Sequence, residues 1–299
     1  MTTKQAHGAT DTPAPDPERD ALSRVIGASP SYRLAYEDLD FMGVDEMRPL
    51  RLQLELSKPE YYLRQYNIHS TIVVFGSARL LPPDQARAQL EALLQRAGGQ
   101  AGDAALQAGI ARARKQLEYA RYYDEARSFS EIVSRHFQQH QRRDFVVVTG
   151  GGPGIMEAAN RGACDAGAHS IGLNITLPRE QAPNPFISPG LCFQFHYFAL
   201  RKMHFLLRAK GLVAFPGGYG TLDELFETLT LVQTGKIEPM PIVLIGERFW
   251  RRLIDFEFLV EEGMISRDDL AHFSIVDSAD EAVALLRDFY KGVPPGQDK

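Results

Sequence analysis

Two glycine clusters stand where a phosphate could be bound. One lies in Thr149–Glu157 and the other in Phe215–Glu224, and each follows an apolar run and precedes a helical pattern. Glycine allows positive φ angles and lets a ligand approach the main chain closely. A helix N-terminus adds unpaired N–H groups and the positive end of the helix dipole. One such loop could equally be a plain strand-to-helix turn, but two in one chain favour a phosphate ligand.

The glycine spacing argues against two common nucleotide-binding motifs. Counting G-x-G-x-x-G from Gly150 places Ile155 at the last glycine position. Asn174, near the end of the third apolar run, leaves no acidic residue there for a ribose hydroxyl. Neither loop ends in the GK[ST] of an ATP-binding P-loop. A nucleoside monophosphate, with one phosphate for one helix end, fits better than a dinucleotide or a triphosphate.

The elements that must position these loops alternate along the chain. Short apolar runs predict strands buried on both faces of a parallel sheet, at Thr71–Phe75, Phe145–Thr149, Ser170–Ile175, Leu191–Phe195, Leu212–Phe215, Ile242–Ile245 and Phe273–Val276. Helical patterns separate most of them, at about 154–167, 198–209, 221–234, 248–262 and 279–290. This alternation predicts an α/β fold: a Rossmann-like, doubly wound parallel sheet with helices on both faces. Ligands of such sheets bind at the carboxyl ends of the strands.

The rest of the chain is expected to form three further parts. Residues 1–20 have too few apolar side chains for a core and no secretory signal, so we expect a disordered tail. Residues 21–68 form an N-terminal extension in which Arg51–Leu56 favours a short helix. Residues 69–292 are expected to form one domain that carries both glycine clusters. It contains a helical insertion at 83–142, with one or two long helices in Ala104–Arg142.

Composition limits the partners and the compartment. The 299 residues carry a net charge of −5, so no general attraction to nucleic acid or to anionic lipid is expected. No apolar stretch is long enough to span a bilayer. Cys164 and Cys192 have no metal-binding spacing and are interpreted as small buried hydrophobes in a reducing compartment. We therefore expect a cytoplasmic protein.

Several motifs together resemble the "lonely guy" (LOG) family of cytokinin-activating phosphoribohydrolases, many of which were long called possible lysine decarboxylases. Pro216–Glu224 is similar to the family signature PGGxGTxxE, and Phe75–Arg79 to its FGSAR motif. Gly150–Met156 resembles its GGG loop, one residue shorter than in plant members. Leu177–Glu180 resembles its PRE segment. The resemblance covers about residues 70–290.

The Arg201-Lys202 pair resembles the arginine–lysine pair of the family, and Glu224 follows Arg201 by 23 positions (224 − 201), which also matches the family. Phe198–Lys202 reads FALRK where plant members carry MHERK, so contacts to the base are expected to differ. The insertion and the N-terminal extension resemble the larger, type II branch, whose members assemble as dimers or higher oligomers.

The resemblance implies a nucleotide site. Glu224 and Arg201 would be catalytic, with Arg201 at the base or leaving group and Lys202 nearby. The substrate-binding residues would be Ser77, Gly151, Gly152, Gly154, Glu180, Lys202, Gly217, Gly218, Tyr219, Gly220, Thr221 and Thr230. Arg79 could also meet the nucleotide. Thr230 lies nine residues past Thr221, about half a turn around a straight helix, which does not favour one shared face.

Glu224 has two competing interpretations. Cleavage of an N-glycosidic bond passes through an oxocarbenium-like ribose, which a fixed carboxylate stabilises while it orients or deprotonates water. Alternatively, Thr221–Glu224 is a T-x-x-E capping box, which needs no ligand. Residue types alone favour neither interpretation, and the resemblance favours catalysis.

The function predicted is hydrolysis of a nucleoside 5′-monophosphate, AMP-like or a cytokinin riboside 5′-monophosphate, to free base and ribose 5-phosphate. The alternative is a non-catalytic nucleotide or cofactor carrier on the same fold. Nothing marks a lysine for a Schiff base with pyridoxal phosphate, so lysine decarboxylation has no support. No cofactor and no metal are expected, and His196 and His204 are interpreted as surface or core residues.

Apolar stripes in the insertion predict assembly. Leu106, Ile110, Ala113 and Leu117 recur at helical spacing, as do Phe129, Val133 and Phe137. If these stripes are exposed, they mark an interface, and a homodimer or a higher homo-oligomer follows. The alternative is that these helices pack on their own sheet.

Overall fold

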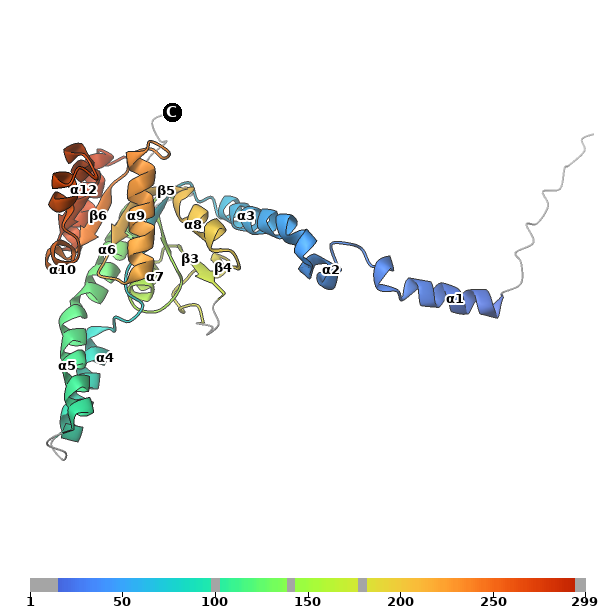
Figure 1. Cartoon of the computed structure of the whole chain (residues 1–299), viewed down its shortest axis with the longest axis horizontal. Coiled ribbons are helices and arrows are strands. Elements are labelled where there is room, and N and C mark those ends of the chain that lie inside the picture. The colour runs from blue at the N-terminus through green and yellow to red at the C-terminus, as the bar shows by residue number, and fades with distance from the viewer. Residues whose placement is uncertain (1–15, 98–102, 139–142, 177–181, 294–299) are drawn as a thin grey trace, which may run out of the picture. The chain divides into compact units, whose positions relative to one another are not determined.

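A computed structural model of the chain describes residues 16–97, 103–138, 143–176 and 182–293. The chain divides into two units, Met1–Leu54 and Glu55–Lys299. Figure 1 traces both units. Within the described residues, no helix is long and apolar enough to cross a membrane.

The larger unit is built on one parallel sheet of seven strands. The strands are β1 (Thr71–Phe75), β2 (Val146–Thr149), β3 (Ser170–Ile175), β4 (Cys192–Phe195), β5 (Ala209–Ala214), β6 (Ile242–Ile245) and β7 (Ser274–Val276). Their order is β4-β3-β2-β1-β5-β6-β7, and every neighbouring pair is parallel. The chain winds outward from β1 to β4 on one side, returns, and continues from β5 to β7 on the other. A topological switch point therefore lies between β1 and β5, where ligands of doubly wound sheets bind.

Helices cover both faces of this sheet, and each face has its own core. On one face α6 (Arg121–Phe137), α7 (Ile155–Asp165) and α12 (Ala279–Phe289) pack around the β1 side chains Ile72 and Val74. On the other face α8 (Phe198–Leu206), α9 (Tyr219–Gln233), α10 (Glu247–Leu253) and the end of α3 (Arg48–Gln65) pack around Val73 and Phe75. Alternate side chains of β1 thus serve opposite cores, as the period of a strand requires.

The predicted fold is confirmed, with the seven strands at the seven apolar runs. One predicted helix, 248–262, is two helices, because Asp255 interrupts it and caps the second, α11 (Phe256–Glu261). The Asp255 carboxylate accepts a hydrogen bond of 3.0 Å from the Phe258 N–H. A 3₁₀ helix, Arg267–His272, follows before β7.

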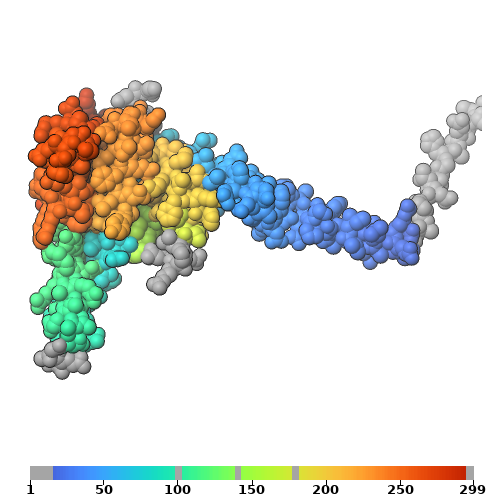
Figure 2. Space-filling model, in the orientation of Figure 1, coloured from blue at the N-terminus to red at the C-terminus, as the bar shows by residue number. Residues whose placement is uncertain are grey.

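The insertion forms three helices: α4 (Pro83–Ala97), α5 (Ala104–Tyr119) and α6. Helices α4 and α5 make a hairpin that extends away from the rest of the domain (Figures 1 and 2). Helix α6 packs on the sheet. Helix α6 crosses α7 closely, since a Cβ at Gly162 would lie 2.0 Å from the Arg127 carbonyl oxygen.

The premise of exposed apolar stripes is wrong. Phe129 and Val133 are fully buried in the core of their own sheet, and Ile110 and Ala113 are 5% and 4% exposed in α5. Both stripes are covered within the chain because α6 packs on the sheet and α5 pairs with α4. They therefore give no support to assembly.

The smaller unit contains α1 (Pro17–Gly27), α2 (Leu39–Gly43), the start of α3 and two 3₁₀ helices, Pro30–Tyr32 and Asp45–Met47. Residues 1–15 of the expected tail lie outside the described residues. Residues 17–20 belong to α1, because the Asp16 carboxylate caps the Glu18 N–H and Pro17 suits the first helical position. The helix expected at Arg51–Leu56 is confirmed as part of α3.

The interpretation of the two cysteines as buried hydrophobes is wrong. Cys164 and Cys192 are both free and exposed. Cys164 lies near the end of α7, one residue past the buried Ala163. Cys192 lies on the edge strand β4, where its two buried neighbours Leu191 and Phe193 face the other side. Residue type suggested burial at both positions, but the face of the element decided otherwise.

Candidate active site

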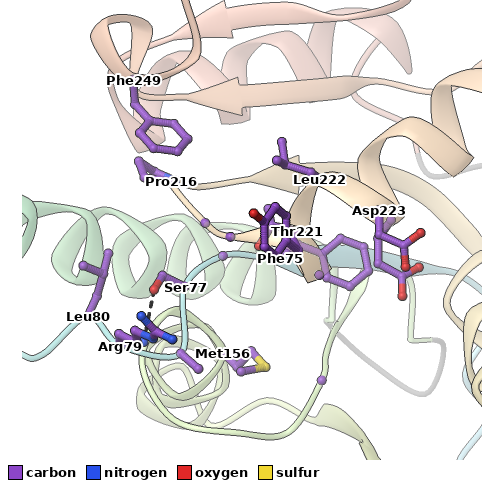
Figure 3. A pocket seen from close by; sticks show the side chains of 18 of the residues that line it. Phe75, Ser77, Arg79, Leu80, Met156, Pro216, Thr221, Leu222, Asp223 and Phe249 are labelled. Carbon is purple, nitrogen blue, oxygen red and sulfur yellow. Dashed lines mark hydrogen bonds between the residues drawn. The ribbon is translucent and has the colours of Figure 1, made fainter. Parts of the chain in front are cut away.

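A cavity of about 750 Å³ opens at the carboxyl ends of the central strands. Its walls come from the segments that follow β1, β2 and β5, so it occupies the switch point (Figure 3). The β1 and β5 loops are tied together, since the Ser77 N–H donates a hydrogen bond of 3.0 Å to the Pro216 carbonyl. The predicted residues that line it are Ser77, Arg79, Arg201, Gly217, Gly218, Tyr219, Gly220, Thr221 and Glu224.

The loop after β5 presents the N-terminus of α9 to this cavity. Gly218 is the N-cap residue and Tyr219 the first helical residue. The Thr221 side chain lies against Gly217, where a Cβ would be 2.1 Å from the Thr221 hydroxyl oxygen. The first N–H groups of a helix lack intrahelical acceptors, so this end of α9 suits an anion.

The capping-box interpretation of Thr221 and Glu224 is wrong. A capping box would require Thr221 to be the N-cap residue, but the helix begins two residues earlier and no side chain of the described residues caps it. Glu224 is instead the sixth residue of α9, about one and a half turns from its start. Its side chain is therefore available to the cavity.

Glu224 is a buried carboxyl group at the floor of the site. Its residue is only 7% exposed. Burial raises the pKa of Glu224 from its ordinary value of 4.5 to about 7, although the nearby charges of Lys202 and Arg201 act in the opposite direction. A carboxyl group with such a pKa can bind and release a proton near neutral pH.

Arg201, from α8, reaches over the ends of β2 and β3. Its Nε donates a hydrogen bond of 2.7 Å to the Leu173 carbonyl. A Cβ at Gly150 would lie 2.6 Å from its guanidinium, so only glycine leaves room for it there. Burial lowers the pKa of Arg201, and the carboxylate of Glu224 partly offsets this effect. The charges of the two predicted catalytic side chains, Arg201 and Glu224, thus interact within one cavity.

The other predicted glycine loop has a supporting role. Gly150 lines the cavity, but Gly151, Gly152 and Gly154 are not among its lining residues. Gly151 has φ of +73° and packs on Asn174. Gly154 has φ of +71° and lets the β1 loop approach, since a Cβ there would lie 2.3 Å from the Ser77 carbonyl oxygen.

A buried polar network holds that loop in place. The Asn184 side-chain amide donates to the Gly152 carbonyl at 3.0 Å and to the Asn160 side-chain oxygen at 2.9 Å. The Thr149 hydroxyl donates to the same Asn160 oxygen at 2.7 Å and accepts from the Gly151 N–H at 3.0 Å. The loop is thereby shaped by its own chain before any ligand is considered.

Lys202 and Thr230 lie outside the main cavity. They line a shallower depression on the outer side of α9. The Lys202 ammonium contacts the carboxylates of Asp223 at 2.8 Å and Glu227 at 3.2 Å. The Thr230 hydroxyl donates to the Phe226 carbonyl at 2.7 Å, one turn earlier in α9. Helical geometry indicated that Thr230 would not share the face of α9 that Thr221 occupies, and the two residues do line different depressions.

One predicted residue cannot be placed, and several cavity residues were not predicted. Glu180 lies outside the described residues. Sequence reasoning missed the apolar lining, which includes Leu80, Tyr119, Met156, Phe249 and Leu253. Only Met156 had a signal, because it ends the glycine loop. His204 is buried and His196 exposed, both away from the lining.

Comparison with known proteins gives the site a context. Residues 156–286 match the family model described as "Possible lysine decarboxylase". The chain is 31% identical over 164 residues to cytokinin riboside 5′-monophosphate phosphoribohydrolase LOG1 of Arabidopsis thaliana, covering 54% of this chain and 72% of that one. It is 30% identical over 182 residues to LOG2 of the same plant, covering 59% and 79%.

Solved structures show a more distant likeness. The molybdenum cofactor carrier protein of Chlamydomonas reinhardtii aligns over 74% of this chain and 98% of its own, with a TM-score of 0.43 and 19% identity. The molybdenum cofactor binding protein of Rippkaea orientalis aligns over 75% and 96%, with a TM-score of 0.42 and 14% identity.

Proposed function

The chain belongs to the LOG family, and from that premise we propose that it hydrolyses the N-glycosidic bond of nucleoside 5′-monophosphates. The products are the free base and ribose 5-phosphate. The substrates are AMP-like nucleotides or cytokinin riboside 5′-monophosphates, in keeping with the names of the plant relatives. The observation that carries the proposal is the buried Glu224 beside the N-terminus of α9 in one cavity with Arg201.

The phosphate is assigned to the N-terminus of α9. Backbone N–H groups of the Gly217–Thr221 segment and the helix dipole stabilise a dianion there without a charged side chain. The Ser77 hydroxyl lines the same part of the cavity. Binding of the phosphate at the N-terminus of α9 fixes the 5′ end of the nucleotide. The sugar then lies farther along α9, toward Glu224.

The chemistry is assigned to Glu224 and Arg201. As the bond between C1′ and the base breaks, positive charge develops on the ribose, and a fixed carboxylate stabilises it. The same carboxylate accepts a proton from the attacking water. Arg201 donates hydrogen bonds to the departing base, which leaves with the bonding electron pair. The departing base takes up a proton, which balances the proton that water gives to Glu224.

Chromatography of the reaction products tests this proposal. Full-length protein is incubated with a panel of nucleoside 5′-monophosphates, and the mixture is analysed for free base and ribose 5-phosphate. We expect equal amounts of both from at least one nucleotide. A protein that binds these nucleotides and returns all of them intact would be a carrier, and the proposal would be wrong.

A further inference from the structure

One end of the cavity is apolar and has no role in the proposed reaction. Its wall consists of Leu80 after β1, Tyr119 at the end of α5, and Phe249 and Leu253 of α10. Tyr119 and Phe249 are partly exposed, and Leu253 is 45% exposed. Figure 3 shows Phe249 and Leu80 on the opposite side of the loop that bears Pro216 from Asp223.

Sheet order fixes where this wall lies relative to the nucleotide. Gly150 follows β2, and Arg201 is bonded to β3, so both mark one side of the switch point. Phe249 belongs to the helix after β6, on the other side. The loop after β5 lies between them. A nucleotide with its phosphate on that loop and its sugar at Glu224 would not contact the wall. The wall would lie on the other side of the phosphate from the sugar.

The wall is held in shape by contacts that join the insertion to the domain. The rings of Tyr119 and Phe249 meet edge to face, with centroids 6.3 Å apart. Their neighbours Glu118 and Arg248 form an ion pair of 2.6 Å. The Gln116 side-chain amide donates to the Arg79 carbonyl of the β1 loop. The last turn of α5 is therefore fixed against both sides of the cavity opening.

Half of this wall comes from outside the matched family region, and Tyr119 comes from the insertion. Leu80 and Tyr119 lie before residue 156, where the family match begins. Preformed apolar walls with few polar groups are typical of small-molecule subsites. Arg79, whose guanidinium is exposed, also lines the cavity next to Leu80 and Ser77 (Figure 3). It supplies a positive charge at the cavity beside Leu80.

We propose that the wall of Leu80, Tyr119, Phe249 and Leu253 is a second subsite, which binds an aromatic group joined to the 5′-phosphate of the nucleotide. The ligand class is a nucleotide 5′-phosphodiester or 5′-diphosphate that ends in an aromatic ring. The ring packs against Tyr119 and Phe249, and the linking phosphate remains at the N-terminus of α9. The proposal rests on the proposed function for placing the nucleoside at Glu224.

Binding of two esters of AMP tests the subsite. The methyl ester and the phenyl ester carry the same charge and differ only in the ring. Calorimetric titrations use the full chain with Glu224→Gln, which should slow turnover at least about 100-fold. We expect the phenyl ester to bind about tenfold more tightly, because its ring is buried against apolar surface. In the added variants Tyr119→Ala and Leu253→Ala this preference should fall to about twofold or less.

Leu94→Ala is the matched control, because Leu94 is an exposed apolar residue of the same insertion away from the cavity. It should keep the full preference. Equal affinity for the two esters, failure of both to bind, or an unchanged preference in both wall variants would overturn the subsite. The preference is independent of turnover: an intact preference without base release from any nucleotide contradicts only the proposed hydrolysis. Base release together with equal ester affinities contradicts only the subsite.

Discussion

Glu224 is held in surroundings that disfavour its charge. It is 7% exposed, and burial is the largest influence on its raised pKa, ahead of Lys202 and the other neighbouring charges. A buried carboxylate is poorly solvated and therefore reactive toward a developing positive charge. Perturbed groups of this kind in a cavity are characteristic of functional sites.

The first prediction concerns pH. The carboxylate form of Glu224 stabilises the ribose cation, so kcat/KM for AMP should rise as pH increases through about 7, the raised pKa. Activity should be lowest below this value, where Glu224 is protonated. The measurement is a pH profile of kcat/KM between pH 5 and 9. A profile that is flat from pH 5.5 to 8 would show that ionisation of Glu224 does not control the reaction.

The second prediction concerns stability. The pKa of Glu224 is about 7 in the folded state, against an ordinary value of 4.5. Between these two pH values the folded state holds a proton that the unfolded state has lost. Its contribution to the free energy of unfolding therefore falls as pH rises from 4.5 to 7. Glu224→Gln removes this loss and should stabilise the protein at pH 8 by on the order of 2 kcal/mol.

Thermal melting of both proteins at pH 4.5 and pH 8 measures this effect. The gain from Glu224→Gln should be present at pH 8 and small at pH 4.5, where the native carboxyl group is already neutral. A variant that is less stable at pH 8 would mean that the buried charge is better compensated than its neighbours indicate.

At the scale of elements, the N-terminus of α9 and the loop before it form the recognition unit. The third prediction is that AMP exceeds adenosine in kcat/KM by at least about 100-fold, because binding of the phosphate positions the sugar. Gly217→Ala should abolish most of this difference, since the new Cβ would meet the Thr221 hydroxyl. Gly109→Ala, in α5, is the control, because its new Cβ would make only an ordinary contact of 4.0 Å with the Leu93 side chain. Equal kcat/KM values for AMP and adenosine would show that the loop does not recognise the phosphate.

The elements themselves were largely readable from the sequence. Continuous apolar runs such as Ile242–Ile245 have one common use, a strand buried on both faces. The two glycine loops were found because glycine is required where Gly150 meets Arg201 and Gly217 meets Thr221. The start of α9 was not predictable, because Gly218 and Tyr219 give no capping signal. Its true position removed the competing interpretation of Glu224.

The composition of the cavity was only half predictable. Loop residues next to strand ends, such as Ser77 and Thr221, follow from the fold. Tyr119 does not, because it comes from the last turn of α5 in the insertion, where it packs on Phe249 and the neighbouring Gln116 bonds to the Arg79 carbonyl. The exposure of Cys192 likewise depends on which face of an edge strand it occupies.

At the scale of the whole molecule, the insertion packs with its own chain. Its apolar stripes are buried by α4 and by the sheet, so an interface must use other surfaces. Apolar side chains remain exposed on α8, on its C-cap residue and on α9: Phe198, Met203, Leu207, Tyr219 and Phe226. Exposed apolar side chains mark a contact surface where they form one patch.

The fourth prediction is that the protein is a homodimer or a higher homo-oligomer. Light scattering at micromolar concentration should give at least twice the monomer mass of 33.4 kDa. Oligomers that use identical patches on two copies are the commonest kind. A mass equal to that of the monomer across the concentration range would end this prediction.

The rate of adenine release from AMP by Glu224→Gln, compared with the natural protein, tests the central claim most directly. Glutamine keeps the shape of the side chain but removes its charge, so one interaction made only in the transition state is lost. We predict a rate at least about 100-fold lower, with AMP still bound at similar affinity by calorimetry. Adenine release at nearly the natural rate would contradict the assignment of Glu224 as the catalytic carboxylate.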